Sequence, residues 1–223
     1  MKALIVRGGW DGHTPVESTD LMAPLMQERG FEVEISDSLD SYTDADKMNA
    51  LSLVVQCVTM DSISDEQERG LLDAVKSGVG FAGWHGGVID SFRPNTEYQW
   101  MTGGQWVAHP GNCIPTYDVV TVDPEHEITA GIESFKLTDT EQYYCHTDPG
   151  NHVLCTTTFS GEHGETTQYP AGTVMPYAWT RQYGEGKVFI AAWGHTYKDF
   201  DVPEAREIVL RGMTWAGTKA ARP

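Results

Sequence analysis

The sequence has few basic residues and no long apolar segment, and each shortage excludes a class of protein. Lysine and arginine number 15 against 32 aspartates and glutamates, which gives a net charge of −17. Phosphate backbones and anionic lipid headgroups repel such a chain, so we expect neither a nucleic-acid partner nor a membrane partner. No apolar run approaches the roughly 20 residues of a membrane-spanning helix. Neutral small molecules such as sugars, or metal cations, suit this charge better.

Cysteine is also scarce, and its pattern indicates reduced thiols. The four cysteines form no C-x-x-C pair, and a chain of 223 residues does not need disulfides to stabilise its core. The apolar stretch at the N-terminus is too short for a signal-peptide core and ends in Arg7-Gly8-Gly9. We therefore expect a cytoplasmic location. The length and the 40% apolar content predict a single domain over residues 1–223.

Strand and helix patterns alternate along the first half, which predicts an α/β fold. The sheet is expected to be mainly parallel, with helices on both faces. Thr14 with Glu17 and Ser64 with Gln67 have the spacing of helix capping boxes, and Pro24 predicts a kink in the first helix or a late start. A predicted α/β fold of this kind is compatible with a homo-oligomer. Strands are expected at 2–6, 31–35, 51–58, 79–84, 116–122, 152–159, 176–181 and 187–192, and helices at 15–30, 64–78 and 203–216.

Residues capable of chemistry follow three of the predicted strands. In an open parallel sheet the carboxyl ends of the strands form the ligand-binding edge. Asp11 and His13 come after the first strand, and His195 follows Gly194 after the last. His85 stands in Gly-Trp-His-Gly-Gly, a version of the strained elbow that usually presents serine or cysteine. Histidine is a poor acyl-transfer nucleophile but a good base or metal ligand.

Two further segments carry candidate groups. The run at 139–146 contains Glu141, Tyr143 and His146, and its alternating pattern is equally compatible with an edge strand. A glycine-rich loop carries His109, but this loop has neither a G-x-G-x-x-G nor a P-loop motif and few basic residues nearby, so we reject a nucleotide site.

A series of short motifs, in a fairly specific order over nearly the whole chain, resembles the trehalose-utilisation (ThuA-like) family. The resemblance implies a flavodoxin-like three-layer sandwich similar to class I glutamine amidotransferases, with histidine where those enzymes carry their nucleophilic cysteine. It also implies catabolism of trehalose or related disaccharides, acting on 3-keto-sugars made by a partner dehydrogenase. The motifs are GG at 8–9 before His13, SDEQ at 64–67, GVGF at 78–81, WHGG at 84–87, GG at 103–104, HP at 109–110, DPEHEI at 123–128, DTEQY at 139–143, PYAWTR at 176–181, YGEGKVF at 183–189, GH at 194–195 and RGMTWA at 211–216.

The resemblance also implies a divalent metal, and the motifs carry that role to His13, His85, Glu141 and His195. Three histidines and one carboxylate form a plausible zinc shell. A metal that polarises a ketone acidifies the neighbouring C–H, so an isomerase, lyase or hydrolase acting on a keto-sugar is expected.

The expected roles follow from this chemistry. The catalytic candidates are His85 and Glu141 as bases and Tyr143 and His146 as proton donors. The substrate-binding candidates are Asp11, Trp84, His109 and Trp193, the tryptophans because flat apolar rings suit sugars. Two alternatives stay open, a thiol amidotransferase or hydrolase that uses Cys57 or Cys145, and a non-catalytic sugar-binding protein.

Overall fold

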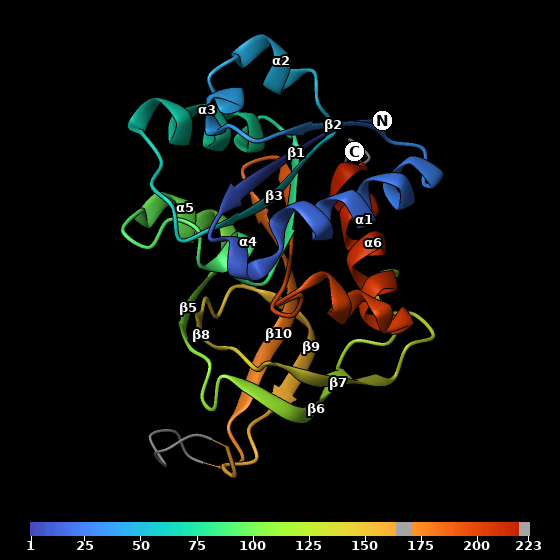
Figure 1. The fold of residues 1–223 in the computed structure, drawn as a ribbon. Helices are drawn as coiled ribbons and strands as arrows, with labels where there is room; N and C mark the ends of the chain where they lie inside the picture. Colours follow the sequence, from blue (N-terminus) through green and yellow to red (C-terminus); the bar gives the residue numbers. More distant parts are fainter. Residues whose placement is uncertain (164–170, 219–223) are drawn as a thin grey trace.

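The first half of the chain forms a parallel sheet whose strands are joined by helices (Figure 1). The computed structural model describes residues 1–163 and 171–218. Strands β3 and β4 are buried throughout, because both faces of the sheet are covered. The elements of this half are β1 Lys2–Gly9, η1 Asp11–His13, α1 Pro15–Glu28, β2 Glu32–Ser36, η2 Leu39–Tyr42, α2 Ala45–Asn49, β3 Leu53–Thr59, α3 Asp65–Lys76 and β4 Gly80–Trp84, where η denotes a 3-10 helix.

The second half extends the same sheet with antiparallel strands. Within the described residues the order is β2-β1-β3-β4-β11-β10-β9-β6-β7, and β11 pairs in parallel with β4 before the direction changes. Strands β5 and β8 form a separate antiparallel pair. The elements are α4 Gly86–Ile89, α5 Thr96–Thr102, β5 Gly104–Ala108, β6 Cys113–Thr121, β7 Ser134–Glu141, β8 Tyr144–Thr147, β9 His152–Thr158, β10 Val174–Tyr183, β11 Gly186–Ala191, η3 Tyr197–Asp201 and α6 Pro203–Gly217.

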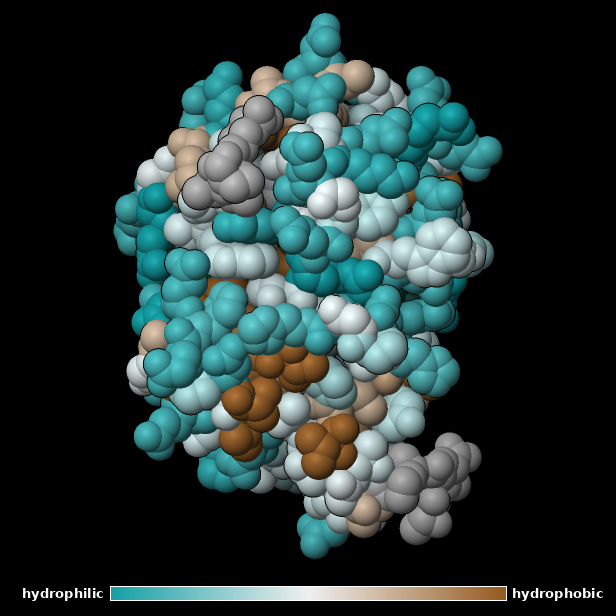
Figure 2. Space-filling view, turned by 180° about the vertical axis from the view of Figure 1, so that it is seen from behind, coloured by the Kyte–Doolittle hydropathy of each residue, from teal (hydrophilic) through white to brown (hydrophobic). Residues whose placement is uncertain are grey.

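The helices lie on the two faces of the parallel strands, which confirms the predicted three-layer α/β fold. Helices α1 and α6 lie together on one side, and α3 and α5 lie on the other (Figure 1). Most of the surface in Figure 2 is hydrophilic, as the acidic composition predicts. Exposed valines at 120, 122 and 174 belong to the β6 and β10 end of the sheet. No helix among the described residues has the length and apolarity that crossing a bilayer requires.

The two predicted helix starts have different outcomes. Ser64 and Gln67 form the expected reciprocal capping box at the start of α3. Thr14 is the N-cap residue of α1 as predicted, but the predicted capping box is wrong, because Thr14 has a left-handed backbone (φ 47°) and its side chain does not cap the helix. Its hydroxyl oxygen instead accepts a hydrogen bond from the Tyr197 amide. Helix α1 begins at Pro15 and runs through Pro24 without interruption.

Candidate functional site

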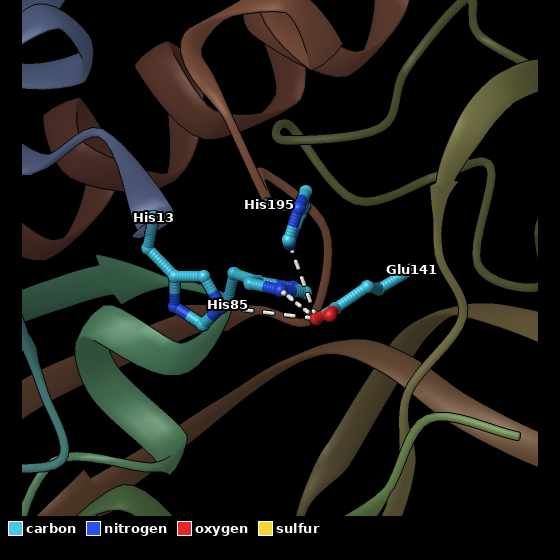
Figure 3. A group of neighbouring side chains, drawn as sticks. All are labelled: His13, His85, Glu141 and His195. Atoms are coloured by element: carbon cyan, nitrogen blue, oxygen red, sulfur yellow. Dashed lines mark hydrogen bonds and ion pairs between the residues drawn. The ribbon is translucent and has the colours of Figure 1, made fainter. Parts of the chain in front are cut away.

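Three histidines meet at the carboxyl edge of the parallel strands. His13 ends η1, directly after β1, His85 follows β4, and His195 follows β11 by four residues. Because these strands run in the same direction, their carboxyl ends lie on one side of the sheet. Figure 3 shows the three rings turned toward a common point. The prediction that strand ends would gather these imidazoles is therefore confirmed.

The fourth group, Glu141, comes from the antiparallel half of the sheet. It is the last residue of β7, and the Tyr117 hydroxyl donates a 2.8 Å hydrogen bond to its backbone carbonyl. Its carboxylate points at the three imidazoles in Figure 3. One ligand atom from each of the four residues lies within 4.8 Å of the other three. Four segments that are far apart in the sequence thus place their nitrogen and oxygen ligand atoms in one compact group.

The backbone at His85 is strained in the way that an elbow requires. Its φ of 49° and ψ of −143° are unusual for a residue with a side chain, and α4 begins at the next residue. A Cβ added to Gly86 would lie 2.4 Å from Cε1 of His13, so only glycine lets these two segments approach. The structure confirms the predicted strand–elbow–helix arrangement.

The three imidazoles contact the same carboxylate oxygen. Oε2 of Glu141 lies 3.1 Å from Nε2 of His85, 3.1 Å from Nδ1 of His195 and 3.7 Å from Nε2 of His13. Nδ1 of His195 makes no hydrogen bond within the described part of the chain, although it is buried. Burial would raise the pKa of Glu141, but the contacts with His13, His195 and His85 outweigh it and hold the pKa far below its usual range.

His85 presents a lone pair to that carboxylate. Burial lowers the pKa of His85 to about 3, against the opposing effect of Glu141, so the ring is neutral at pH 7. Nδ1 must carry its proton, because it donates to the backbone carbonyl of Ala192 at 3.1 Å. Nε2 then faces Oε2 of Glu141 at 3.1 Å, and a cation between the two atoms, whether a second proton or a metal ion, would make this contact favourable.

The donor set fits a divalent transition metal. Zinc and the other divalent first-row transition metals bind imidazole nitrogen and carboxylate oxygen, and three or four such ligands form a common coordination shell. Thr59 lies 3.0 Å from Nδ1 of His13 and Ala192 accepts from Nδ1 of His85, so a second partner orients each of these two rings. The residues able to hold a metal are His13, His85, Glu141 and His195.

Two other predicted residues lie beside this cluster. The ring of Tyr143 stacks on His85 with 3.7 Å between centroids, and burial raises the pKa of its phenol, so the hydroxyl keeps its proton. Nε2 of His109 lies 3.7 Å from Oε1 of Glu141, the oxygen that does not face the other histidines. The sequence alone gave no reason to place His109 within reach of Glu141.

The remaining predictions fare less well. Trp84 and Trp193 are 1% and 0% exposed, which corrects the expectation that their rings contact a substrate. They lie in the core because Trp84 is the last residue of the buried strand β4 and Trp193 comes two residues after the buried strand β11. Trp84 packs on Phe200, and Trp193 donates to the carbonyl of Ala205. Asp11 and His146 have exposed side chains outside the four-residue cluster.

A different tryptophan lies at the site. Trp10 is 48% exposed and its ring meets His13 edge-on, with 4.8 Å between centroids. The exposed thiol of Cys113 lies 3.9 Å from Nε2 of His195, because β6 pairs Cys113 directly with Glu141. The contact of Cys113 with His195 could not be assigned from sequence, because it depends on how distant segments pair, whereas Trp10 and His13 lie only three residues apart.

The thiols predicted for the alternative enzyme are unsuited to nucleophilic chemistry. All four cysteines are free, and Cys57 and Cys145 are buried. Burial raises the pKa of Cys57 to about 12 and raises that of Cys145 as well, so neither forms a thiolate at neutral pH. The elbow position is occupied by His85.

The neutral state of His85 predicts acid sensitivity of the metal-free protein. An unfolded histidine takes up a proton near pH 6.5, whereas folded His85 does so only near pH 3. Unfolding therefore binds a proton between these values, and the free energy of unfolding falls by about 1.4 kcal/mol per pH unit for that proton as pH falls. Glu141, whose pKa is lowered, adds a loss of the same sign below pH 4.5.

Urea unfolding with a chelator at pH 7, 6 and 5 measures this dependence. His85→Gln removes the titrating ring, so the variant should lose less stability than the wild type over this range. If the free energy of unfolding depended equally on pH in the two proteins, this result would contradict a neutral His85.

Comparisons with known proteins agree with the fold and the motif order. The family model for ThuA, described as trehalose utilisation, matches residues 2–216. No curated protein is similar enough in sequence to count as a match. A ThuA-like protein from Bacteroides uniformis has a TM-score of 0.79 at 16% identity and covers 97% of this chain and 91% of its own. One from Parabacteroides merdae has a TM-score of 0.75 at 17% identity, over 100% and 92%.

A more distant structure has the same fold. A glutamine amidotransferase from Thermotoga maritima has a TM-score of 0.53 at 11% identity, over 86% of this chain and 74% of its own. This likeness concerns the fold alone, whereas the family model spans nearly all of the sequence. The chain belongs to the ThuA family of trehalose utilisation.

Proposed function

We propose that this protein is an enzyme of carbohydrate catabolism that acts on a 3-keto-disaccharide or a related keto-sugar by metal-assisted acid–base chemistry. The observation that carries the proposal is the convergence of His13, His85, His195 and Glu141 on one point at the sheet edge. Family membership supports a sugar as the substrate. The reaction is an isomerisation or an elimination, each of which begins with removal of a proton from a carbon next to the ketone, or a hydrolysis, in which water attacks the glycosidic carbon and the second sugar leaves as an alcohol.

The four clustered residues hold a divalent metal, with zinc as the first candidate. When bound, the metal supplies Lewis acidity, which polarises a ketone oxygen and acidifies the adjacent C–H. The site also favours cations through its charge, because Glu141 is ionised and the chain carries −17 overall.

Proton transfer falls to the residues beside the cluster. Oε1 of Glu141 faces His109, so His109 is placed to take a proton from the substrate, whereas the low pKa of Glu141 makes its carboxylate a weak base. The Tyr143 phenol keeps its proton and its ring stacks on His85, so we assign donation toward a leaving oxygen to Tyr143, which is 1% exposed and would have to be uncovered when the substrate binds. His146 lies on β8 with its side chain outside the four-residue cluster.

Trp10 is the aromatic ring placed to bind the sugar. Its half-exposed face adjoins His13, so a pyranose ring stacked on it would bring its ketone near the cluster. Asp11, next in the chain and exposed, is placed to accept hydrogen bonds from sugar hydroxyls. We therefore assign stacking on the sugar ring to Trp10 in place of Trp84 and Trp193, which are buried.

The test is conversion of 3-keto-trehalose, followed by proton NMR. Protein purified without a histidine tag is stripped with a chelator and assayed before and after zinc is restored. We expect new product signals only in the zinc-restored sample, and no change with trehalose itself, which lacks the ketone.

Three other outcomes would reject the proposal. Saturable binding without conversion would indicate a non-catalytic sugar-binding protein. Loss of activity on alkylation of buried thiols, with no metal requirement, would indicate the thiol enzyme. The absence of both conversion and binding would exclude the keto-sugar as substrate.

A further inference from the structure

The short 3-10 helix η3, residues Tyr197–Asp201, contacts two of the segments that carry the cluster through residues at its two ends. The Tyr197 amide donates a 3.0 Å hydrogen bond to the hydroxyl of Thr14, the residue that follows His13. The Phe200 ring packs edge-on against Trp84, with 5.6 Å between centroids, and Trp84 directly precedes His85.

Asp199, in the middle of η3, joins the other two segments through a single oxygen. Its Oδ2 accepts hydrogen bonds from the Thr140 hydroxyl at 3.0 Å, from the Gly194 amide at 3.1 Å and from the His195 amide at 2.9 Å. Thr140 directly precedes Glu141 in β7. One buried carboxylate therefore connects the backbones that present Glu141 and His195.

These contacts are costly to break. Asp199 is buried, and removal of its carboxylate would leave two amides and a hydroxyl without their acceptor. Hydrogen bonds to a carboxylate are about twice as strong as those between neutral groups. The loop also lies tightly on η3, because a Cβ on Gly194 would come within 2.8 Å of both Phe200 and Trp84.

We propose that Asp199 is a positioning residue that sets the spacing of His195 and Glu141, and that η3 is the common support of all four metal-binding segments. The inference deepens the proposed function and rests on its metal site. Asp199 itself does not belong to the four-residue cluster. Its effect passes through the backbone of His195 and through Thr140.

The variants Asp199→Ala, Asp199→Asn and Thr140→Val test this role, with Thr129→Val as a matched control. Thr129 is also buried, but its hydroxyl donates to the backbone carbonyls of Asp123 and His126, away from η3. Cobalt(II) serves as the probe, with affinity measured against a chromophoric chelator and geometry read from its visible absorption bands. Thermal melting of each metal-free variant shows that it is folded.

We expect Asp199→Ala to weaken cobalt binding about 10- to 100-fold and to change the absorption bands. Thr140→Val removes one of the three hydrogen bonds and should weaken binding roughly fivefold. Asp199→Asn keeps an oxygen acceptor and should fall between the alanine variant and the wild type. The Thr129→Val control should bind as the wild type does.

Wild-type affinity and absorption bands in the folded Asp199 and Thr140 variants would overturn the inference, as would an equal loss in Thr129→Val. If Asp199→Ala does not fold, the cobalt affinity of Thr140→Val decides whether the inference holds.

A wild-type protein that binds no cobalt would refute the metal site of the proposed function, and the positioning role is then read from the nitrogen-15 signals of the His195 ring. Signals altered in Asp199→Asn but not in Thr129→Val support the role, and unaltered signals overturn it.

Discussion

Replacement of His85 by alanine is expected to lower turnover of the keto-sugar by at least about 100-fold, the smallest loss typical for an acid–base or metal-binding group. His85 stands at the strained elbow, and its Nε2 lies 3.1 Å from the carboxylate oxygen that also contacts His13 and His195. Removal of the imidazole deletes one of the four ligand atoms. We therefore expect the variant to contain much less zinc than the wild type, as measured by atomic spectrometry.

The variant should remain folded. The substitution removes the hydrogen bond to Ala192 and the stacking contact with Tyr143, and we expect a loss of about 1–3 kcal/mol in the free energy of unfolding. Urea unfolding measures that loss. His152→Ala is the matched control, because His152 is exposed and pairs with Asp123 outside the cluster. Wild-type turnover in the His85 variant would remove the elbow from the mechanism.

The part of the site that could be predicted from the sequence is the part that depends on local pattern. His13, His85 and His195 each follow a buried apolar strand, and the carboxyl ends of parallel strands must meet at one edge. The Ser64 capping box is equally local, since both of its hydrogen bonds join residues three apart. Such features are encoded within a few residues, so a single sequence is enough to find them.

The features that local pattern does not encode depend on pairing between distant segments. Strand β7 is polar on alternate residues, so only the family resemblance, and nothing within the strand, predicted that Glu141 would join the three histidines. Threonine is a common helix-capping residue, but the hydroxyl of Thr14 accepts a hydrogen bond from the Tyr197 amide of η3, which is 183 residues away in the sequence. Trp84 and Trp193 have the aromatic rings of a sugar site, and only the packing of Phe200 and α6 on them shows that they are core residues.

Glu141→Gln is expected to weaken zinc binding at pH 7 by at least about 100-fold. Glutamine has nearly the same shape, so the change removes the negative charge and leaves the packing in place. In the wild type that charge lies 3.1–3.7 Å from ring nitrogens of His13, His85 and His195, and these contacts keep the pKa of Glu141 far below its usual range. A bound ion would then have three imidazoles and an amide oxygen as ligands, and an amide oxygen is a much poorer donor than a carboxylate.

Competition with a chromophoric chelator measures the zinc affinity, and Glu133→Gln is the control because Glu133 is exposed and lies outside the cluster. The control makes the same change in net charge, so a loss confined to Glu141→Gln reflects the site and not the overall field of the chain. Turnover should fall together with bound zinc. If Glu141→Gln instead retained full zinc affinity but lost turnover, the carboxylate would act only in proton transfer, and the metal would be held by the three histidines alone.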